Sequence, residues 1–309
     1  LQHVGRRPGT DHFLVTPLAI TIANESSIGQ YPVGIFINVH NTIYVNDRQN
    51  NRILSWHNDT WTSMIDGNLI NPWSIFITET NEILIDNGYV NGRVDKWTLN
   101  GTYYGPVMYI NSSCISLFVD IANNLYCSLA NEHRVLKKVE LNSTVVTVAG
   151  TGCPGPTANM LDHPNGIFID KKFNLYVADT DNNRIQYFQS GQIYATTLAG
   201  QDTLIYSPLN RPTSVIFDED NNMFIVDSGN HRIIRLISNN FECLFGCSGK
   251  HGSLSSQLNS PQTIAFDTFG NLFVTDYNNH RIQKFNLINN TYGKHILRLL
   301  HTVYIDYLF

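Results

Sequence analysis

The sequence predicts an all-β fold, a six-bladed β-propeller with four-stranded antiparallel blades. Its first basis is a pattern that recurs six times in 309 residues: a proline, a short apolar strand ending near an aspartate, a polar turn, a second strand and an arginine. The second is spacing, because successive copies of the arginine lie 41, 41, 50, 48 and 49 residues apart, which is typical of propeller blades. The third is periodicity. Apolar residues alternate with period two, whereas a helical solenoid would show stripes with a period of 3.6 residues.

The fourth copy shows the strands of one blade in order. Strand a is expected over residues 166–170, strand b over 175–178, strand c over 184–188 and strand d over 194–199. Short polar turns join them, as antiparallel hairpins require. The apolar strands are expected to face neighbouring blades, which stack sheet on sheet at about 10 Å.

The other copies extend this reading to a single propeller domain over residues 1–309. The N-terminal segment 18–24 resembles the strand-d segment 197–200, so we expect it to complete the last blade. The C-terminal segment 295–300 competes for that place. The six repeat cores are residues 32–56, 72–97, 114–138, 164–188, 212–236 and 261–285.

The recurring motif Asp-x-x-Asn-x-Arg makes the chain similar to the NHL-repeat family. Asn230-His231-Arg232 and Asn279-His280-Arg281 carry the motif best, and the resemblance covers residues 20–290. It implies a six-bladed propeller that recognises protein, RNA or other ligands, with a minority of relatives catalytic. The fold does not decide between these roles.

Copies two and three depart from the family pattern. Copy two has an extra residue before Arg93, which displaces its acidic position to Asp86. Copy three has Cys114 in place of the proline and Leu129 in place of the aspartate. We expect local irregularity in these two blades.

The composition limits the classes of partner. The net charge is −5 and the pI about 6.1, which argues against nucleic acid because nucleic-acid binders usually carry a basic excess. No stretch approaches the ~20 apolar residues that span a bilayer. Five cysteines do not suggest a disulfide framework. Cys243 and Cys247 are near enough in sequence to bridge, but we expect unpaired thiols.

Aspartate and arginine recur at a fixed spacing in the repeats, as in Asp47 and Arg52. A guanidinium has five donors and suits the task of tying a loop's carbonyl groups to a carboxylate. Because the pairing repeats, we expect an architectural role, not catalysis. The remaining members of this set are Arg93, Arg134, Asp179, Arg184, Asp227, Arg232, Asp276 and Arg281.

Three histidines of the repeats are candidate metal ligands, but their positions argue against a shared site. His133, His231 and His280 precede the repeat arginine in three different blades, and ligands dispersed around a ring do not converge on one zinc ion. Amidating lyases share this propeller type and are understood to hold zinc with histidines that face the central cavity. The residues before the repeat proline or its substitute, which match those places here, include one histidine, His163. The sequence therefore predicts no metal, no cofactor and no catalytic residue.

The leading functional interpretation is a binding scaffold, either a monomer or a module of a longer chain. Its partner, a protein, peptide or glycan, is expected on the upper face, where the d–a and b–c loops lie. A metal-dependent lyase or hydrolase that uses the central cavity is the alternative, and a cytosolic scaffold of the ubiquitin-ligase type is the second alternative. The candidate binding residues are Tyr31, Asn71, Tyr89, His163, Arg211 and Tyr277.

Four Asn-x-Ser/Thr sites fall in the expected c–d turns on the lower face: Asn58, Asn100, Asn142 and Asn289. Glycans there would leave the upper face bare. This placement favours an extracellular, secreted protein, with a cytoplasmic location as the alternative.

Overall fold

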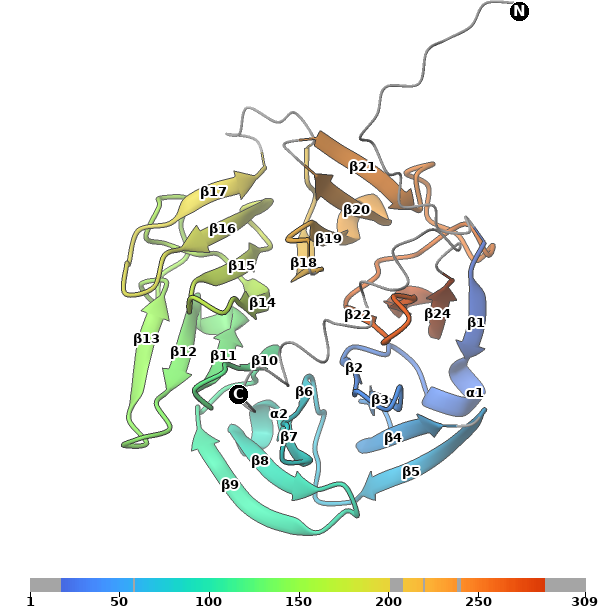
Figure 1. The fold of residues 1–309 in the computed structure, drawn as a ribbon, viewed down its shortest axis with the longest axis horizontal. Coiled ribbons are helices and arrows are strands. Elements are labelled where there is room, and N and C mark those ends of the chain that lie inside the picture. The colour runs from blue at the N-terminus through green and yellow to red at the C-terminus, as the bar shows by residue number, and fades with distance from the viewer. Residues whose placement is uncertain (1–17, 58, 201–207, 219, 238–239, 287–309) are drawn as a thin grey trace, which may run out of the picture.

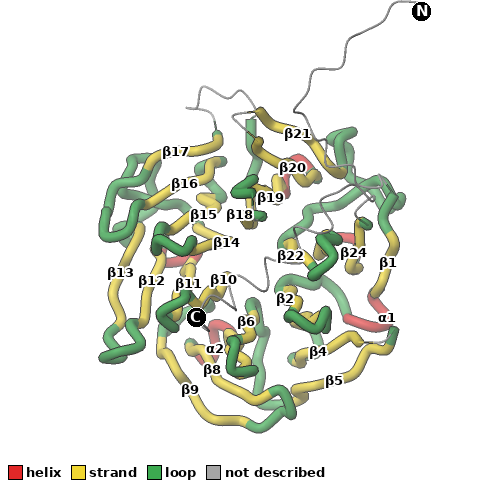
Figure 2. The backbone as a smooth tube through the Cα atoms, viewed as in Figure 1, coloured by secondary structure: helices red, strands yellow, loops and turns green. Residues whose placement is uncertain are grey.

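Six four-stranded antiparallel sheets are arranged in a ring around a central axis (Figure 1). The structure is a computed structural model that describes residues 18–286 except residues 58, 201–207, 219 and 238–239. Strands dominate this part of the chain, and the helices are short segments in the connections (Figure 2). None of these helices is long and apolar enough to cross a membrane. The predicted six-bladed propeller is confirmed.

Within blades one to five the strands pair in chain order from the axis outward (Figure 1). Blade one contains β2 (Ile35–Ile37), β3 (Ile43–Asp47), β4 (Arg52–His57) and β5 (Thr60–Asp66). Blade two contains β6 (Ile75–Ile77), β7 (Glu82–Asp86), β8 (Arg93–Thr98) and β9 (Tyr103–Tyr109). Blade three contains β10 (Ser116–Val119), β11 (Leu125–Leu129), β12 (Arg134–Lys138) and β13 (Val145–Ala149). Blade four contains β14 (Pro164–Ile169), β15 (Leu175–Asp179), β16 (Arg184–Phe188) and β17 (Thr196–Ala199). Blade five contains β18 (Pro212–Phe217), β19 (Met223–Asp227), β20 (Arg232–Ile237) and β21 (Asn240–Phe245).

Blade six is built from both ends of the ring. It contains β22 (Ile264–Phe266), β23 (Leu272–Asp276) and β24 (Arg281–Phe285), and its outer strand is β1 (Ile20–Ala23). Antiparallel pairing sets Thr21 opposite Gln283, and the Thr21 hydroxyl donates to the Gln283 side-chain oxygen at 2.8 Å. Closure by the N-terminal segment is thus confirmed. The competing segment 295–300 lies outside the described residues.

Short helices occupy the b–c loops and the entry to blade one. The helix α1 (Glu25–Ile28) follows β1, and its N-cap Asn24 accepts a hydrogen bond from the Ser26 backbone N–H. The b–c loops contain α2 (Gly88–Asn91), η1 (Ala130–Glu132), η2 (Ser228–Asn230) and η3 (Tyr277–Asn279).

The apolar core is divided into six clusters, each at a junction between neighbouring blades. At the junction of blades five and six, for example, Phe224 and Val226 pack with Ile264 and Leu272. The expected stacking of blade on blade is therefore what buries the apolar faces of the sheets.

Two disulfides correct the expectation of unpaired thiols. Cys114 bonds to Cys127, and Cys243 bonds to Cys247. The a–b hairpin of blade three sets the first pair 5.3 Å apart between Cα atoms, and the turn after β21 sets the second pair 5.7 Å apart. Both separations suit a disulfide. Cys153 is a free, exposed cysteine.

Candidate functional site

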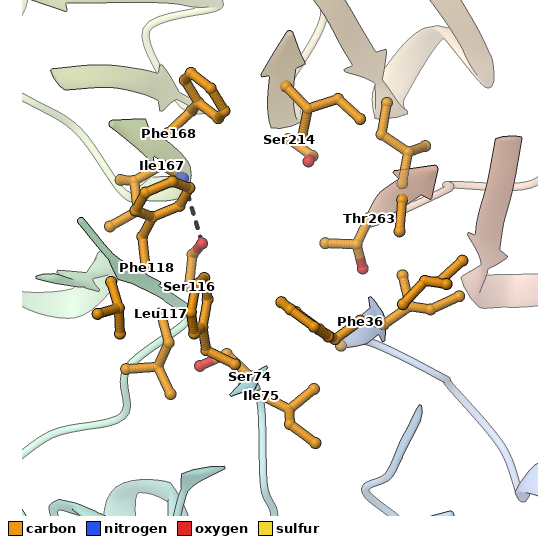
Figure 3. A pocket seen from close by; sticks show the side chains of 18 of the residues that line it. Phe36, Ser74, Ile75, Ser116, Leu117, Phe118, Ile167, Phe168, Ser214 and Thr263 are labelled. Atoms are coloured by element: carbon orange, nitrogen blue, oxygen red, sulfur yellow. Dashed lines mark hydrogen bonds between the residues drawn. The ribbon is translucent and has the colours of Figure 1, made fainter. Parts of the chain in front are cut away.

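The inner strands of all six blades enclose a central cavity of about 650 Å³ (Figure 3). Side chains alternate along these strands, so each strand serves two surfaces. In β2, Ile35 and Ile37 are buried between blades, whereas Phe36 is half-buried and lines the cavity. Phe36 is therefore the side chain of β2 that is left most open to the cavity.

Four consecutive blades place a phenylalanine at the same point of this wall. These residues, which we call the phenylalanine belt, are Phe36, Phe76, Phe118 and Phe168. Their ring centroids lie 5.1, 5.6 and 5.4 Å apart in succession, the spacing of favourable tilted and edge-to-face pairs. Several of the rings face the same open space in Figure 3.

Blades five and six carry no phenylalanine at the belt position. Ile216 and Ala265 take the equivalent position, because they pair with Phe224 and Phe273 as Phe36 pairs with Tyr44. Both line the cavity. Phe217 and Phe266, one residue further along, also line the cavity, and the Phe217 ring lies 5.0 Å from that of Phe168. Ala265 has the smallest side chain at the belt position.

A set of hydroxyl side chains lies two residues before the belt position. The Ser74 hydroxyl donates to the Cys114 carbonyl oxygen at 2.6 Å, and the Ile167 N–H donates to the Ser116 hydroxyl at 3.3 Å (Figure 3). The Thr263 hydroxyl donates to the Val33 carbonyl oxygen. Each of these bonds joins two neighbouring blades, so these hydroxyls hold the ring together.

Carboxylates stand at the other end of the inner strands, where the a–b turns begin. Asp120 and Asp267 line the cavity, and each accepts a hydrogen bond from an asparagine four residues later. Burial raises the pKa of Asp267, and hydrogen bonds from Asn271 oppose that shift. These carboxylates are occupied in shaping their turns.

Backbone geometry at the upper rim explains the histidines. In five blades the residue before the repeat proline has a positive φ of 48–57° and donates its N–H to a histidine or asparagine of the preceding blade. The acceptor distances run from 2.8 to 3.3 Å. We call each of these bonds an interblade clamp. The donor and acceptor pairs are Tyr31 and His280, Asn71 and Asn51, His163 and His133, Arg211 and Asn183, and Ser260 and His231.

One clamp is expected to weaken in acid. The His231 ring accepts through Nδ1, and burial together with the nearby His251 lowers its pKa from 6.5. The neutral ring is thus favoured in the folded state. Its contribution to stability is complete above about pH 6.5 and is lost as the pH falls toward the lowered folded-state pKa. His231→Asn keeps the acceptor, as Asn183 does, but cannot titrate. We expect the melting temperature of wild type to fall more steeply than that of this variant below pH 6.5. Parallel curves would contradict a role for His231 protonation.

Two of the predicted binding residues form an aromatic cluster at the junction of blades six and one. The rings of Tyr31 and Tyr277 lie 5.0 Å apart, and Tyr31 packs edge-on against His280 at 4.5 Å. The Arg48 guanidinium lies 3.8 Å above the Trp73 ring, a cation–π contact. Burial lowers the pKa of Arg48, which the Tyr277 hydroxyl beside it opposes. Trp73 also lines the cavity, so this cluster connects the upper face to the cavity.

The other predicted binding residues lie elsewhere on this rim. His163 and Arg211 meet through Asp181, at 2.9 and 2.7 Å. Tyr89 is exposed in α2, where the Asn71 carbonyl approaches the neighbouring Gly88. His163 is the one histidine before a repeat proline, but a second histidine lies beside it. Its ring lies 4.8 Å from that of His133, because the clamp joins the two residues.

The repeated Asp–Arg pairs form in four blades, each with Nε 2.7 Å from the carboxylate. Arg184 additionally donates to the carbonyl oxygens of Pro156, Thr157 and Met160, which belong to the long connector before blade four. The same arginine therefore fixes both a b–c loop and a connector.

Blades two and three are irregular here, as expected. In blade two, Arg93 pairs with Asp95 at 2.9 Å, and Asp86 instead accepts the N–H groups of Cys114 and Gly88 at 2.7 and 3.1 Å. Burial raises the pKa of Asp86 to about 7. In blade three, Arg134 pairs with Glu132.

Two of the predicted glycosylation sites are described. Asn100 and Asn142 are exposed in the c–d turns of blades two and three, and each side chain accepts the N–H two residues later. Asn58 and Asn289 lie outside the described residues. Glycosylation stays a prediction that mass spectrometry of the natural protein would test.

The cavity wall was not predicted from the sequence. Phenylalanine recurs four residues after the repeat proline or its substitute in four consecutive copies, and this signal was available. Apolar alternation alone does not show which surface the middle residue of strand a faces.

Comparisons with known proteins agree with this architecture. The NHL repeat model matches residues 258–285, in blade six. No curated protein sequence matches the chain at a significant level. Solved structures do match. One is a protein of unknown function from Bacteroides thetaiotaomicron, with 15% identity, a TM-score of 0.72, and 87% of this chain and 75% of that chain covered.

Two similar structures are named after enzymes. Virginiamycin B lyase from Staphylococcus aureus is 14% identical, with a TM-score of 0.63 over 90% of this chain and all of that one. A gluconolactonase from Xanthomonas campestris is 15% identical, with a TM-score of 0.66 over 87% and 89% of the two chains. Identities this low establish the fold alone. The chain is a six-bladed β-propeller that carries an NHL repeat in its last blade.

Proposed function

We propose that this chain is a binding protein that takes an aromatic or branched aliphatic side chain of a peptide or protein partner into the central cavity from the upper face. The observation that carries the proposal is the phenylalanine belt around a cavity of about 650 Å³. Sites for small ligands and ligand groups are typically about 300–1,000 Å³ and lined mostly by apolar and aromatic side chains. Apolar burial would supply most of the affinity.

Five of the polar side chains that line the cavity are engaged in the fold, which supports binding over catalysis. Ser74, Ser116 and Thr263 are engaged in bonds between blades, and Asp120 and Asp267 are engaged in turns. Among the described residues that line the cavity there is no histidine or cysteine. The lyase alternative would need such ligands or another reactive pair at this wall, so we favour the scaffold.

The aromatic cluster at the junction of blades six and one supports entry from the upper face. Tyr31 and Tyr277 offer aromatic faces, and Arg48 offers a cation held over Trp73. Aromatic residues and arginine are the side chains most enriched at the centres of protein interfaces. Trp73 contacts Arg48 on one side and the cavity on the other, and would link contacts outside with a side chain inside.

The test uses Ala265→Phe, which adds a ring at the belt position of blade six and takes up space in the cavity. A peptide array centred on aromatic and aliphatic residues would identify binders, and 1-anilinonaphthalene-8-sulfonate would report on the cavity directly. We expect this variant to weaken binding of both probes by about 10-fold or more, because it fills space the ligand needs. Ala158→Phe, on the exposed connector before blade four, is the matched control. Peptide binding that survives Ala265→Phe would place recognition outside the cavity.

A further inference from the structure

A compact cluster of metal-ligating side chains lies at the junction of blades three and four, outside the cavity wall. The donor atoms of His133, Asp162 and His163 all lie within 4.8 Å of one another. Asp181 extends the cluster, because its Oδ2 is 2.9 Å from His163 Nδ1. All four residues are half-buried, so an ion in solution has access to them.

The cluster holds more hydrogen-bond acceptors than donors. His133 Nδ1 accepts the backbone N–H of His163 at 3.3 Å, so it carries a lone pair and no proton. Asp162 Oδ1, another acceptor, lies 3.3 Å from that nitrogen. Two acceptors so close repel each other unless a cation lies beside them.

The second histidine has the same imbalance. His163 Nδ1 is 2.9 Å from both Asp162 Oδ1 and Asp181 Oδ2, and one proton on that nitrogen serves only one of them. Arg211 pairs with the other oxygen of Asp181 at 2.7 Å and leaves Asp162 without a cation of its own. A divalent ion would satisfy these acceptors together.

The architecture does not require these side chains. Asp162 donates its backbone N–H to the repeat aspartate of its blade, and Asn210 and Asn259 do the same in blades five and six. The clamp position of His163 is filled by Arg211 and Ser260 in those blades, with the same backbone conformation. Only the junction of blades three and four places ligating side chains at all three positions among those described.

We propose that His133, Asp162 and His163 bind a zinc ion, with Asp181 as the fourth ligand. Two imidazoles with carboxylates suit a divalent transition metal, and bonds of about 2.0–2.2 Å put tetrahedral ligands about 3.3 Å apart. The observed separations of 2.9 and 3.3 Å need only small side-chain rotations, and His133 Nδ1 exchanges its long 3.3 Å hydrogen bond from the His163 N–H for the bond to the ion. The ion would tie the b–c loops of blades three and four to the connector between them. This proposed zinc site differs from the expectation, drawn from the sequence, that the chain holds no metal.

The experiment is calorimetric titration of the chelator-treated chain with zinc chloride slightly above neutral pH. Cys153→Ser serves as the parent, because the free thiol is itself a zinc ligand. The test variant adds Asp162→Asn and His163→Ser, the residues that blade six has at these positions. We expect about one zinc per parent chain, and affinity about 100-fold or more weaker in the variant. Cobalt substituted at the site should give the visible bands of a tetrahedral ion in the parent only.

The control is His251→Ala. His251 lies against His231 at the corresponding junction of blades five and six, with ring centroids 5.3 Å apart, where Asn259 and Ser260 replace the ligands. This variant should bind zinc like the parent. The proposal is overturned if the parent binds no zinc, or if the test variant keeps the same stoichiometry and affinity, which would place the ion elsewhere.

Discussion

Replacing Arg184 with alanine is expected to lower the free energy of unfolding by about 3–5 kcal/mol, as removal of one partner of a buried ion pair typically does. Arg184 is 8% exposed, and its partner Asp179 is fully buried. The change leaves the Asp179 carboxylate without its cation. It also removes the donors to the Pro156, Thr157 and Met160 carbonyl oxygens, so the connector loses its hydrogen bonds to the b–c loop.

Urea denaturation of the Arg184→Ala variant would measure this loss. Arg211→Ala is the control, because that side chain is 61% exposed and also pairs with an aspartate. An exposed pair contributes about 0–1 kcal/mol, so the control should unfold close to wild type. Equal and small effects of the two changes would show that the repeated arginine is not an architectural residue.

Gly150→Ala is expected to destabilise the chain by about 2 kcal/mol more than Gly152→Ala. Both glycines have a left-handed backbone, with φ of 81° and 86°, so both variants carry the same conformational strain of about 1–2 kcal/mol. They differ in space. A Cβ on Gly150 would lie 2.2 Å from the His133 carbonyl oxygen and 2.8 Å from the Arg134 Cα atom, whereas a Cβ on Gly152 meets nothing within 4 Å.

The additional destabilisation of Gly150→Ala comes from overpacking against backbone atoms of the b–c loop. These atoms cannot move aside without disturbing that loop. Chemical denaturation of the two variants side by side would measure it. Indistinguishable unfolding would mean that the connector shifts freely and that the close approach is unimportant.

The six blades could be predicted from the sequence because each blade repeats the same local pattern of strands and turns. Alternation of apolar residues and the spacing of the arginines were enough to predict six blades, and the N-terminal segment 18–24 was recognised by its similarity to a strand d. A single departure from the motif, such as Leu129 in blade three, does not obscure a pattern that the other blades repeat. Fold-level prediction therefore succeeded without any knowledge of side-chain contacts.

The sites were harder to predict because they depend on contacts between blades. His133 and His163 are 30 residues apart and meet only because a backbone N–H of one blade reaches a ring of the preceding one. Cys114 and Cys127 pair through a hairpin whose register the sequence leaves open. The phenylalanine belt needed one further step, the assignment of the middle residue of each inner strand to the axis of the ring.

The closure of blade six determines the order in which the molecule is assembled. Thr21 and Gln283 are 262 residues apart, so the N-terminal strand has no partner during synthesis until the last blade has left the ribosome. After the last blade has emerged, the edge of β24 and the apolar cluster between blades six and one stay open to other chains until β1 docks. Rings of this kind are vulnerable to strand exchange between newly made molecules, in which β1 of one copy completes the blade of another. Five blades can form as the chain emerges, and the sixth joins its beginning to its end.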